Sequence, residues 1–451
     1  MSGSYQAYPT YKDSNIEWVG DIPEKWSVKP LFSVASTESV KNIDGEETNV
    51  LSLSYGNIIR RDVEDNFGLL PESFNTYQLV NPGELILRLT DLQNDKRSLR
   101  VGHAKEKGII TSAYLKLIAK MSQLNDSYLY RLLHSYDTTK VFYGMGGGLR
   151  QSMKFEEMRR LPILIPSLDE QEKIINFLDQ ETAKIDILIE KQQQLIKLLK
   201  EKRQAVISHA VTKGLNPNAP MRDSGVEWLG EVPEHWKVSS LGYYSTVSTG
   251  ATPDRSKHQY WGGEIPWIKT GEVKYDEIFE TEEHITLEGV VNSAVKISPP
   301  GTLLMAMYGQ GVTRGRVAIL GIEATYNQAC AAITLNEKLW NKYLRYFFMA
   351  AYHAIRDGGN ETSQMNLNAD IVSKFKITIP EMHEQHNIVQ YLDVELKSFD
   401  ILIEKAVDAI ELIQERRTAL ISAAVTGKID VRNWESQEPA NNKNTRKLQH
   451  E

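Results

Sequence analysis

The chain has 451 residues and a formal net charge of -7, with 41% hydrophobic and 25% charged residues. This length suits about three domains, and the composition is that of an ordinary globular protein rather than a disordered or fibrous one. A single cysteine, Cys330, excludes a disulfide framework and favours a reducing, cytoplasmic location, and no apolar run is long enough to span a membrane. The negative charge argues only weakly against nucleic-acid binding, because binding faces are local.

Much of the first half of the chain returns in the second half. DSNIEWVGDIPEKWSV at 13–28 recurs as DSGVEWLGEVPEHWKV at 223–238, and each copy predicts a turn that buries its last tryptophan. A Pro-Gly pair precedes ELILRL in the first half and TLLMAM in the second, which predicts a buried strand in each. We therefore expect an α+β protein with two similar mixed α/β domains.

A long helix is predicted after each domain. EQEKIINFLDQETAKIDILIEK and EQHNIVQYLDVELKSFDILIEK begin 214 residues apart, and seam residues alternate three and four apart from Ile175 to Ala210 and from Val389 to Ala424. This 3.5-residue period is typical of a coiled coil, so we expect the two helices to pack antiparallel as a spacer with a pseudo-two-fold repeat. Arg203 and Arg417 interrupt the seam at equivalent positions. Their candidate partners are Glu395 and Glu181, or carboxylates of a bound partner protein, with solvated arginines as the alternative.

These patterns divide the chain into seven segments. In order they are a flexible N-terminus (1–12), domain 1 (13–166), helix 1 (167–213), a linker (214–222), domain 2 (223–380), helix 2 (381–430) and a disordered tail (431–451).

Motifs for catalysis are weak in this sequence. There is no phosphate-binding glycine loop and no Asn/Asp-Pro-Pro-aromatic motif of amino-methyltransferases. Asp254 with Glu272 and Lys274 imitates a PD-ExK nuclease core, but the first half has no counterpart. His383, Glu384 and His386 imitate a metal cluster at a predicted helix start, where polar residues are expected anyway. We expect no catalytic residues, no metal and no cofactor on this chain.

Polar loops with arginine, lysine, amides and aromatics occur in both domains. Such side chains suit base edges and phosphates, although ordinary surface loops have a similar composition. The candidate DNA-binding residues are Tyr55, Asn57, Arg60, Arg88, Thr90, Arg97, Arg100, Arg150, Gln151 and Lys154 in domain 1, and Thr252, Arg255, Lys257, Trp267, Lys269, Thr270, Arg314, Asn360, Thr362, Gln364 and Asn366 in domain 2.

Several of these motifs together resemble one family. The PEKW and PEHW segments, IPWIKTGEV, the Ile-Pro-x-x-x-Glu-Gln helix starts and the repeated DILIEK look like the specificity subunit of type I restriction–modification systems, over about residues 13 to 430. The resemblance implies two target-recognition domains that each read half of a split site in double-stranded DNA. It also implies helices that bind two methyltransferase subunits, with restriction subunits joining the assembly. S-adenosylmethionine, and ATP with Mg for restriction, would then belong to those partner subunits.

The sequence thus favours a non-catalytic DNA-recognition subunit. Two alternatives stay open at this point: a single-chain nuclease built on the PD-ExK-like residues, and a coiled-coil adaptor without a DNA role.

Overall fold

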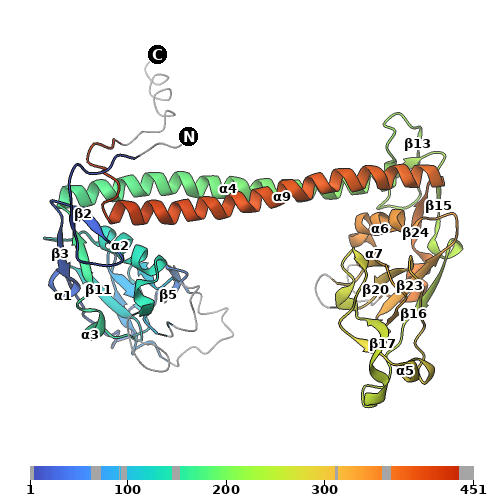
Figure 1. The fold of residues 1–451 in the computed structure, drawn as a ribbon, viewed down its shortest axis with the longest axis horizontal. Coiled ribbons are helices and arrows are strands. Elements are labelled where there is room, and N and C mark those ends of the chain that lie inside the picture. The colour runs from blue at the N-terminus through green and yellow to red at the C-terminus, as the bar shows by residue number, and fades with distance from the viewer. Residues whose placement is uncertain are drawn as a thin grey trace. The chain divides into compact units, whose positions relative to one another are not determined.

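Residues 5–61, 73–90, 92, 99–144, 153–309, 313–357 and 367–435 are described by a computed structural model. The chain forms two units, one of residues 1–192 with 408–451 and the other of residues 193–407. Each unit holds one α/β domain and part of each long helix, α4 (Leu168–Lys213) and α9 (Met382–Val425) (Figure 1). The predicted fold class, two mixed domains and two long helices in an internal repeat, is confirmed.

The domain of the first unit is built around a four-stranded antiparallel sheet. Its order is β4 (Ala35–Ser36), β11 (Leu115–Ala119), β8 (Leu85–Leu87) and β9 (Val101–His103). Two separate two-stranded sheets accompany it, β7 (Gln78–Val80) with β10 (Gly108–Ile110) and the hairpin of β5 (Leu51–Ser54) with β6 (Asn57–Arg60). Helix α2 (Asp126–Thr138) packs on β9 and β11, and the short helices are α1 (Leu31–Val34), η1 (Val141–Gly144) and α3 (Phe155–Met158). Strand β8 is buried and follows the predicted Pro82-Gly83 turn, where Gly83 has a φ of 90°.

The domain of the second unit has a larger sheet and a separate small one. The larger sheet runs β16 (Ser245–Thr249), β23 (Cys330–Leu335), β20 (Leu303–Ala306), β21 (Val317–Leu320) and β18 (Glu277–Ile278). The small sheet runs β19 (His284–Ile285), β17 (Trp261–Ile268) and β22 (Thr325–Tyr326). Its helices are η2 (Leu241–Tyr243), η3 (His258–Tyr260), η4 (Thr270–Glu272), α5 (Leu287–Val291), α6 (Asn341–Ala350), α7 (Tyr352–Asp357) and α8 (Ala369–Lys374). Strand β20 follows Pro300-Gly301, as predicted.

The base of each domain is made from the same two strand pairs. In the first unit β1 (Tyr11–Asp13) pairs with β2 (Asp21–Pro23), and β3 (Ser27–Pro30) pairs with β12 (Pro162–Ile165). In the second unit β13 (Met221–Asp223) pairs with β14 (Glu231–Pro233), and β15 (Lys237–Ser240) pairs with β24 (Lys376–Ile379). These pairs bring the PEKW and PEHW turns to the start of the long helices.

One glutamate at each helix start holds the tryptophan of that turn. Trp26 is buried and its Nε1 donates to Glu170 at 3.0 Å, while Trp236 is buried and its Nε1 donates to Glu384 at 3.2 Å. Glu170 also accepts from the Tyr8 hydroxyl at 2.6 Å; burial, and then this bond, raise the pKa of Tyr8. The predicted burial of both indoles is confirmed.

The next residue in each helix, a glutamine, is buried and ties the domain to the helix. Gln171 bonds to the carbonyls of Gln123 and Pro166 and to the amide of Asn125. Gln385 makes the same three bonds in the second unit, to Lys338, Pro380 and Trp340. The Glu-Gln motif is therefore structural in both copies.

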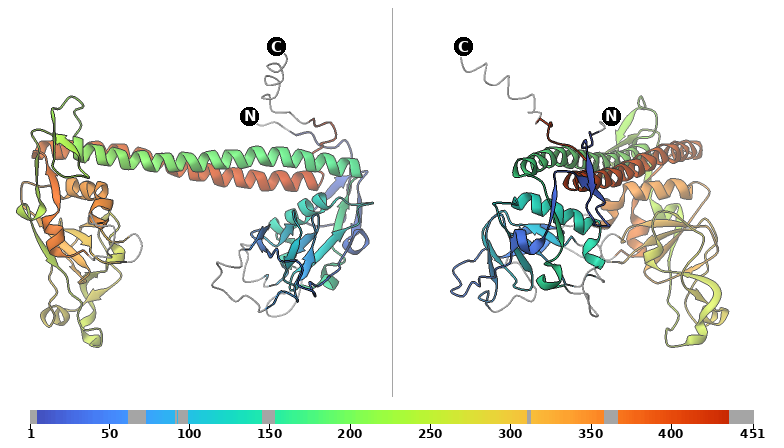
Figure 2. Two further views of the ribbon diagram at one scale, coloured as in Figure 1. Left: turned by 180° about the vertical axis from the view of Figure 1, so that it is seen from behind. Right: turned by 60° about the vertical axis from the view of Figure 1, so that its left-hand side comes forward.

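The far end of the other long helix completes each unit. The Tyr128 hydroxyl donates to the carbonyl of Val425 at 3.3 Å in the first unit, and the Tyr343 hydroxyl donates to that of Val211 at 3.1 Å in the second. Within each unit the helices run side by side in opposite directions (Figure 2). All the predicted seam positions from Ile175 to Ala210 and from Val389 to Ala424 are buried or half-buried, which confirms the heptad.

The seam arginines form ion pairs, but not with the expected glutamates. Arg417 Nε lies 2.9 Å from an oxygen of Asp186, and Arg203 Nε lies 3.0 Å from an oxygen of Asp400. Both aspartates open the repeated DILIEK segments. The predicted partner Glu181 instead bonds to Lys184 and Tyr5, so the choice of glutamate was wrong by about one helical turn along the partner helix.

Parts of the segments expected to be flexible, residues 5–12 and 431–435, have defined contacts. Helix α9 ends at Val425, not at 430, because Gly427 adopts a φ of 73° and the amide of Lys428 bonds back to the Ala423 carbonyl. Residues 5–12 and 431–435, expected to be flexible, pack on the first unit. Tyr8 and Val431 are buried, and the Trp434 ring meets Phe177 edge to face at 5.6 Å.

Candidate nucleic-acid interface

A hairpin presents three candidate residues in the first unit. Tyr55 and Gly56 form the two-residue turn between β5 and β6, both with positive φ, and Tyr55 is 71% exposed. Asn57 and Arg60 follow on β6, and Arg60 is exposed and paired with Glu106 at 3.0 Å. A two-stranded ribbon of this kind fits the major groove, and the phenol, amide and guanidinium are groups that bind base edges and phosphates.

Arg100 does not belong to that surface. Its side chain is 0% exposed, its Nη1 donates to the Thr90 carbonyl at 2.8 Å, and its backbone amide donates to the Asp137 carboxylate. Burial raises the pKa of Asp137 to about 6, the main cause being desolvation. The predicted DNA contact by Arg100 is therefore corrected to a structural role, because a buried guanidinium cannot reach a duplex.

The other candidates of the first unit lie apart from the hairpin or outside the described residues. Arg88 and Thr90 are half-buried near the end of β8. Lys154 is exposed at the start of α3, where its amide donates to Glu157 at 2.7 Å. Arg97, Arg150 and Gln151 lie outside the described residues.

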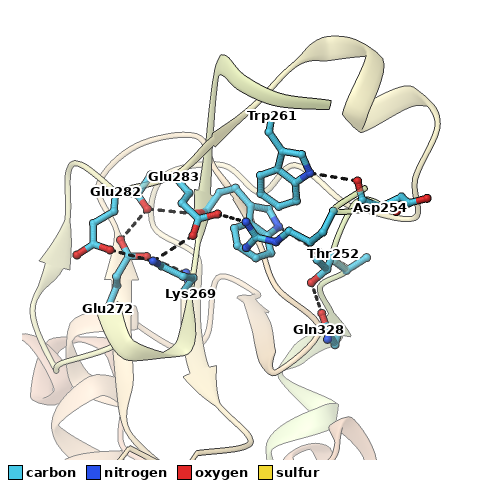
Figure 3. A network of polar contacts seen from close by, with 12 residues as sticks. Thr252, Asp254, Trp261, Lys269, Glu272, Glu282, Glu283 and Gln328 are labelled. Carbon is cyan, nitrogen blue, oxygen red and sulfur yellow. Dashed lines mark hydrogen bonds and ion pairs between the residues drawn. The ribbon is translucent and has the colours of Figure 1, made fainter. Parts of the chain in front are cut away.

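The second unit brings several candidates together beside its small sheet. The guanidinium carbon of Arg255 lies 3.8 Å from the ring centre of Trp261 and 4.9 Å from that of Trp267. Arg255 Nη1 bonds to Glu283 at 2.6 Å, and Lys269 Nζ bonds to Glu282 at 2.9 Å and to Glu283 at 3.2 Å. Figure 3 shows Glu283 between Lys269 and the tryptophan side of this network.

Hydrogen bonds fix the loop that carries Arg255. Asp254 accepts from the amide and hydroxyl of Ser256, which holds the turn, and its own carbonyl accepts from Trp261 Nε1 at 3.2 Å. The Thr252 hydroxyl donates to Gln328 on a neighbouring loop (Figure 3). Lys257 is exposed and bonds to the Tyr260 hydroxyl.

Trp267 supports this network from inside. It is 2% exposed, and its Nε1 donates to the Ala251 carbonyl at 3.0 Å. The predicted DNA contact by Trp267 is therefore corrected to a supporting role, because the indole is covered by the sheet and the Arg255 loop.

Two further candidates of the second unit, Thr270 and Arg314, lie on other elements. Thr270 is half-buried at the start of η4, and Arg314 bonds to the Arg356 carbonyl at 3.1 Å. Asn360, Thr362, Gln364 and Asn366 lie outside the described residues.

The imitations of catalytic motifs are explained by local structure. Asp254 caps its own turn, while Glu272 accepts from the Lys269 amide and the Thr281 hydroxyl at the other end of the network (Figure 3). His386 stacks on Trp340 at 4.3 Å. Among the described residues, no three His, Cys, Asp or Glu side chains are grouped to hold a metal ion.

Sequence reasoning missed Trp261, Glu283 and Gln328. Trp261 and Trp267 lie on one strand and their rings meet edge to face at 5.0 Å, but the register of β17 shifts between Trp261 and Ile265, so their spacing in the sequence does not by itself predict this contact. Glu283 and Gln328 come from segments far along the chain, and no local pattern relates them to Arg255.

Comparison with known proteins gives one consistent result. The family model for the type I restriction modification DNA specificity domain matches residues 100–198 and 233–412. The type I restriction enzyme MjaVIII specificity subunit of Methanocaldococcus jannaschii is 24% identical over 454 residues, which cover 94% of this chain and 98% of that protein. The EcoR124I/EcoR124II specificity subunit of Escherichia coli is 24% identical over 308 residues, 66% of this chain and 70% of that protein.

Solved structures share the fold. A chain from a structure on complex assembly and conformational transition of the type I R-M system aligns with a TM-score of 0.68 and 14% identity, over 90% of this chain and 99% of that one. The HsdS subunit from Thermoanaerobacter tengcongensis aligns with a TM-score of 0.52 and 14% identity, over 90% and 98%. None of the helices among the described residues contains an apolar stretch of the length that a membrane span needs.

Proposed function

We propose, from the premise that the chain belongs to the type I restriction modification DNA specificity family, that it selects the DNA sequence on which partner subunits act. The observation that carries this proposal is the duplication itself. The two domains are attached to the helices in the same way, and each exposes polar and cationic side chains. These are Tyr55, Asn57 and Arg60 on a hairpin of the first domain, and Arg255 and Lys257 beside the small sheet of the second.

Each domain reads its own half of a bipartite site in double-stranded DNA. The sheet order β4-β11-β8-β9 of the first domain returns in the second as β16-β23-β20-β21, with β18 added, but the exposed side chains on this shared frame differ in kind, so the two half-sites differ. Arginine and amide side chains distinguish bases in the major groove by paired hydrogen bonds, whereas lysine contributes chiefly through phosphates.

The helices bind two methyltransferase subunits through a repeated outer surface. The two DILIEK segments are identical, and each exposes two apolar side chains by about half: Ile187 and Leu188 in the first, Ile401 and Leu402 in the second. Apolar residues exposed in pairs at equivalent positions suit two copies of one partner, because each copy meets the same surface.

The chemistry belongs to the partners under this proposal. The methyltransferase subunits hold S-adenosylmethionine and flip an adenine out of the duplex into their own site. Restriction subunits, with ATP and Mg, join the same assembly, and this chain contributes recognition alone.

A domain exchange tests the proposed recognition. Residues 30–160 are replaced by the equivalent segment of another family member, the chain is expressed with its methyltransferase, and methylated positions are mapped across a genome. We expect one half of the methylated motif to change and the other to stay. A change in both halves, or methylation without any motif, contradicts modular recognition.

A second experiment tests the partner surface. Ile187→Glu with Leu188→Glu is expected to leave one methyltransferase per chain, and adding Ile401→Glu with Leu402→Glu to leave none, as measured by the mass of the purified complex. Val394→Glu is the matched control, because Val394 is exposed on α9 but its counterpart on α4 is the polar Gln180. Two bound subunits in every variant contradict this surface.

A further inference from the structure

Arg255 is held in one orientation from two directions. Trp261 and Trp267 lie against the guanidinium, with centroid distances of 3.8 and 4.9 Å. Glu283 fixes Nη1 through a bond of 2.6 Å. Yet the side chain of Arg255 remains 54% exposed, so part of its donor fork faces solvent.

Glu283 is itself fixed by a second cation. Its other oxygen, Oε1, lies 3.2 Å from Lys269 Nζ, and Lys269 is also bound to Glu282. The Arg255 and Lys269 bonds lower the pKa of Glu283, so its carboxylate stays charged at neutral pH. The result is a chain of alternating charges that ends at the exposed arginine.

This arrangement suits a base edge better than the phosphate backbone. The cluster contains Glu272, Glu282, Glu283 and Asp254 against Arg255, Lys257 and Lys269, so its summed charge does not attract phosphates in general. An aligned planar fork, in contrast, matches the paired acceptors O6 and N7 of guanine, and stacking on an indole removes the entropy cost of aligning it.

We propose that Arg255 is a specificity-determining residue that reads a guanine in the half-site of the second unit, with Trp261 and Glu283 as positioning residues. This inference rests on the proposed function, since it requires that the second unit read DNA. It goes further by assigning one base preference to one side chain.

The test uses the full chain assembled with its methyltransferase subunits. DNA duplexes that vary one base pair at a time across both half-sites compete for the complex, and relative affinities are measured at fixed salt. Arg255→Ala and Arg255→Lys are each expected to lower discrimination about 5- to 150-fold at one base pair, where guanine is preferred, and to leave other positions within about twofold. Arginine and lysine carry the same charge, so equal loss in both variants assigns the effect to the fork.

The positioning residues have their own expected pattern. Glu283→Gln and Trp261→Ala lose discrimination at the same base pair only, and Trp261→Phe, which restores a stacking face, regains most of it. Arg159→Ala is the matched control, because Arg159 lies 5.2 Å from the Phe32 ring centre and bonds to Glu156 in the first unit. It is expected to leave the second half-site unchanged.

The two proposals fail in different ways. A wild-type complex without sequence preference overturns the proposed function. This inference alone is overturned if the wild-type complex is selective and its Arg255 variants keep full discrimination. Tryptophan fluorescence shows whether those variants are folded. Equal weakening of all duplexes also overturns this inference, since that is the behaviour of a phosphate contact.

Discussion

Two parts of each unit can be compared between the halves of the chain. The attachment of the domain to the helices is nearly the same in both units, whereas the strands that carry the candidate DNA contacts differ more. At the attachment, Trp26 with Glu170 and Trp236 with Glu384 make the same bond, and both neighbouring glutamines bond to equivalent backbone groups. Away from it, the sheet order β4-β11-β8-β9 is kept as β16-β23-β20-β21, but the first unit adds two strand pairs, one of them the β5–β6 hairpin, whereas the second adds β18 and a three-stranded sheet.

The difference indicates where substitutions are tolerated. A buried indole and a buried amide with three backbone partners leave little freedom, because any change creates a cavity or an unpaired polar group. Exposed hairpins and loops have no such requirement. The domains can therefore change the DNA they read while keeping their place on the helices.

Removing the buried tryptophans is expected to have the largest effect. Trp26→Ala and Trp236→Ala should each lower the free energy of unfolding of their unit by about 3–5 kcal/mol, because each leaves a cavity and removes a donor from a glutamate. Urea unfolding followed by circular dichroism measures it. Trp18→Ala, where the ring is 46% exposed, is the control and should cost less than about 1 kcal/mol. Clearly unequal losses of unfolding free energy would show that the two attachments, although they make the same bond, do not stabilise their units equally.

Replacing the two glutamines is expected to cost somewhat less. Gln171→Leu and Gln385→Leu each unpair two carbonyls and one amide, so we expect a loss of about 2–3 kcal/mol in each unit. Hydrogen exchange gives a local measurement, since the amides of Asn125 and Trp340 should lose protection. If protection at both amides is retained, the glutamines are not what joins domain and helix.

The two units are expected to respond differently to pH. In the first unit burial raises the pKa of Asp137 to about 6, so its stabilising contribution is present below pH 4 and lost as pH rises to 6. Burial lowers the pKa of His134 to about 4, so its contribution is lost as pH falls from 6.5 to 4. The two trends oppose each other in the wild type.

Single variants separate these trends. Asp137→Asn should leave a first unit whose stability rises from pH 4 to 6.5, and His134→Gln one whose stability falls over that range. The equivalent positions of the second unit are Tyr352 and Met349, so its profile should lack both trends. Unfolding curves at several pH values decide this, and identical profiles for the two variants would contradict it.

The smallest effect is expected at the helix ion pairs. Double-mutant cycles of Arg417 with Asp186, and of Arg203 with Asp400, should give coupling energies of about 0.3–1 kcal/mol, because all four side chains are partly exposed. The couplings should be similar and should shrink in high salt. A coupling energy at one pair only would show that the two equivalent ion pairs do not contribute equally to stability.

The sequence was most informative where a pattern occurs in both halves of the chain. The heptad, the Pro-Gly turns and the duplicated attachment segments predicted the helices, strands β8 and β20, and the buried tryptophans. The ion pairs were assigned to Glu181 and Glu395 rather than Asp186 and Asp400, because the register of two antiparallel helices depends on packing at both ends.

The candidate site was less predictable for a different reason. Charge and exposure do not follow from residue type alone: Arg100 was selected as a surface arginine, but it fills the space beside Asp137. Arg255, predicted as a DNA-binding residue, is exposed, and its partners Trp261 and Glu283 come together only through the pairing of β17 with β19.

The division of the helices between units also sets an order of assembly. The second unit is one continuous segment, and its bond from Tyr343 to Val211 spans 132 residues. The first unit begins earlier but needs the last part of α9, and its bond from Tyr128 to Val425 spans 297 residues. On a ribosome, the segment made first is therefore the last to find all its contacts. Until residue 425 has emerged, part of the apolar base of the first domain stays uncovered. During that interval this domain is the part of the nascent chain most accessible to proteases and chaperones.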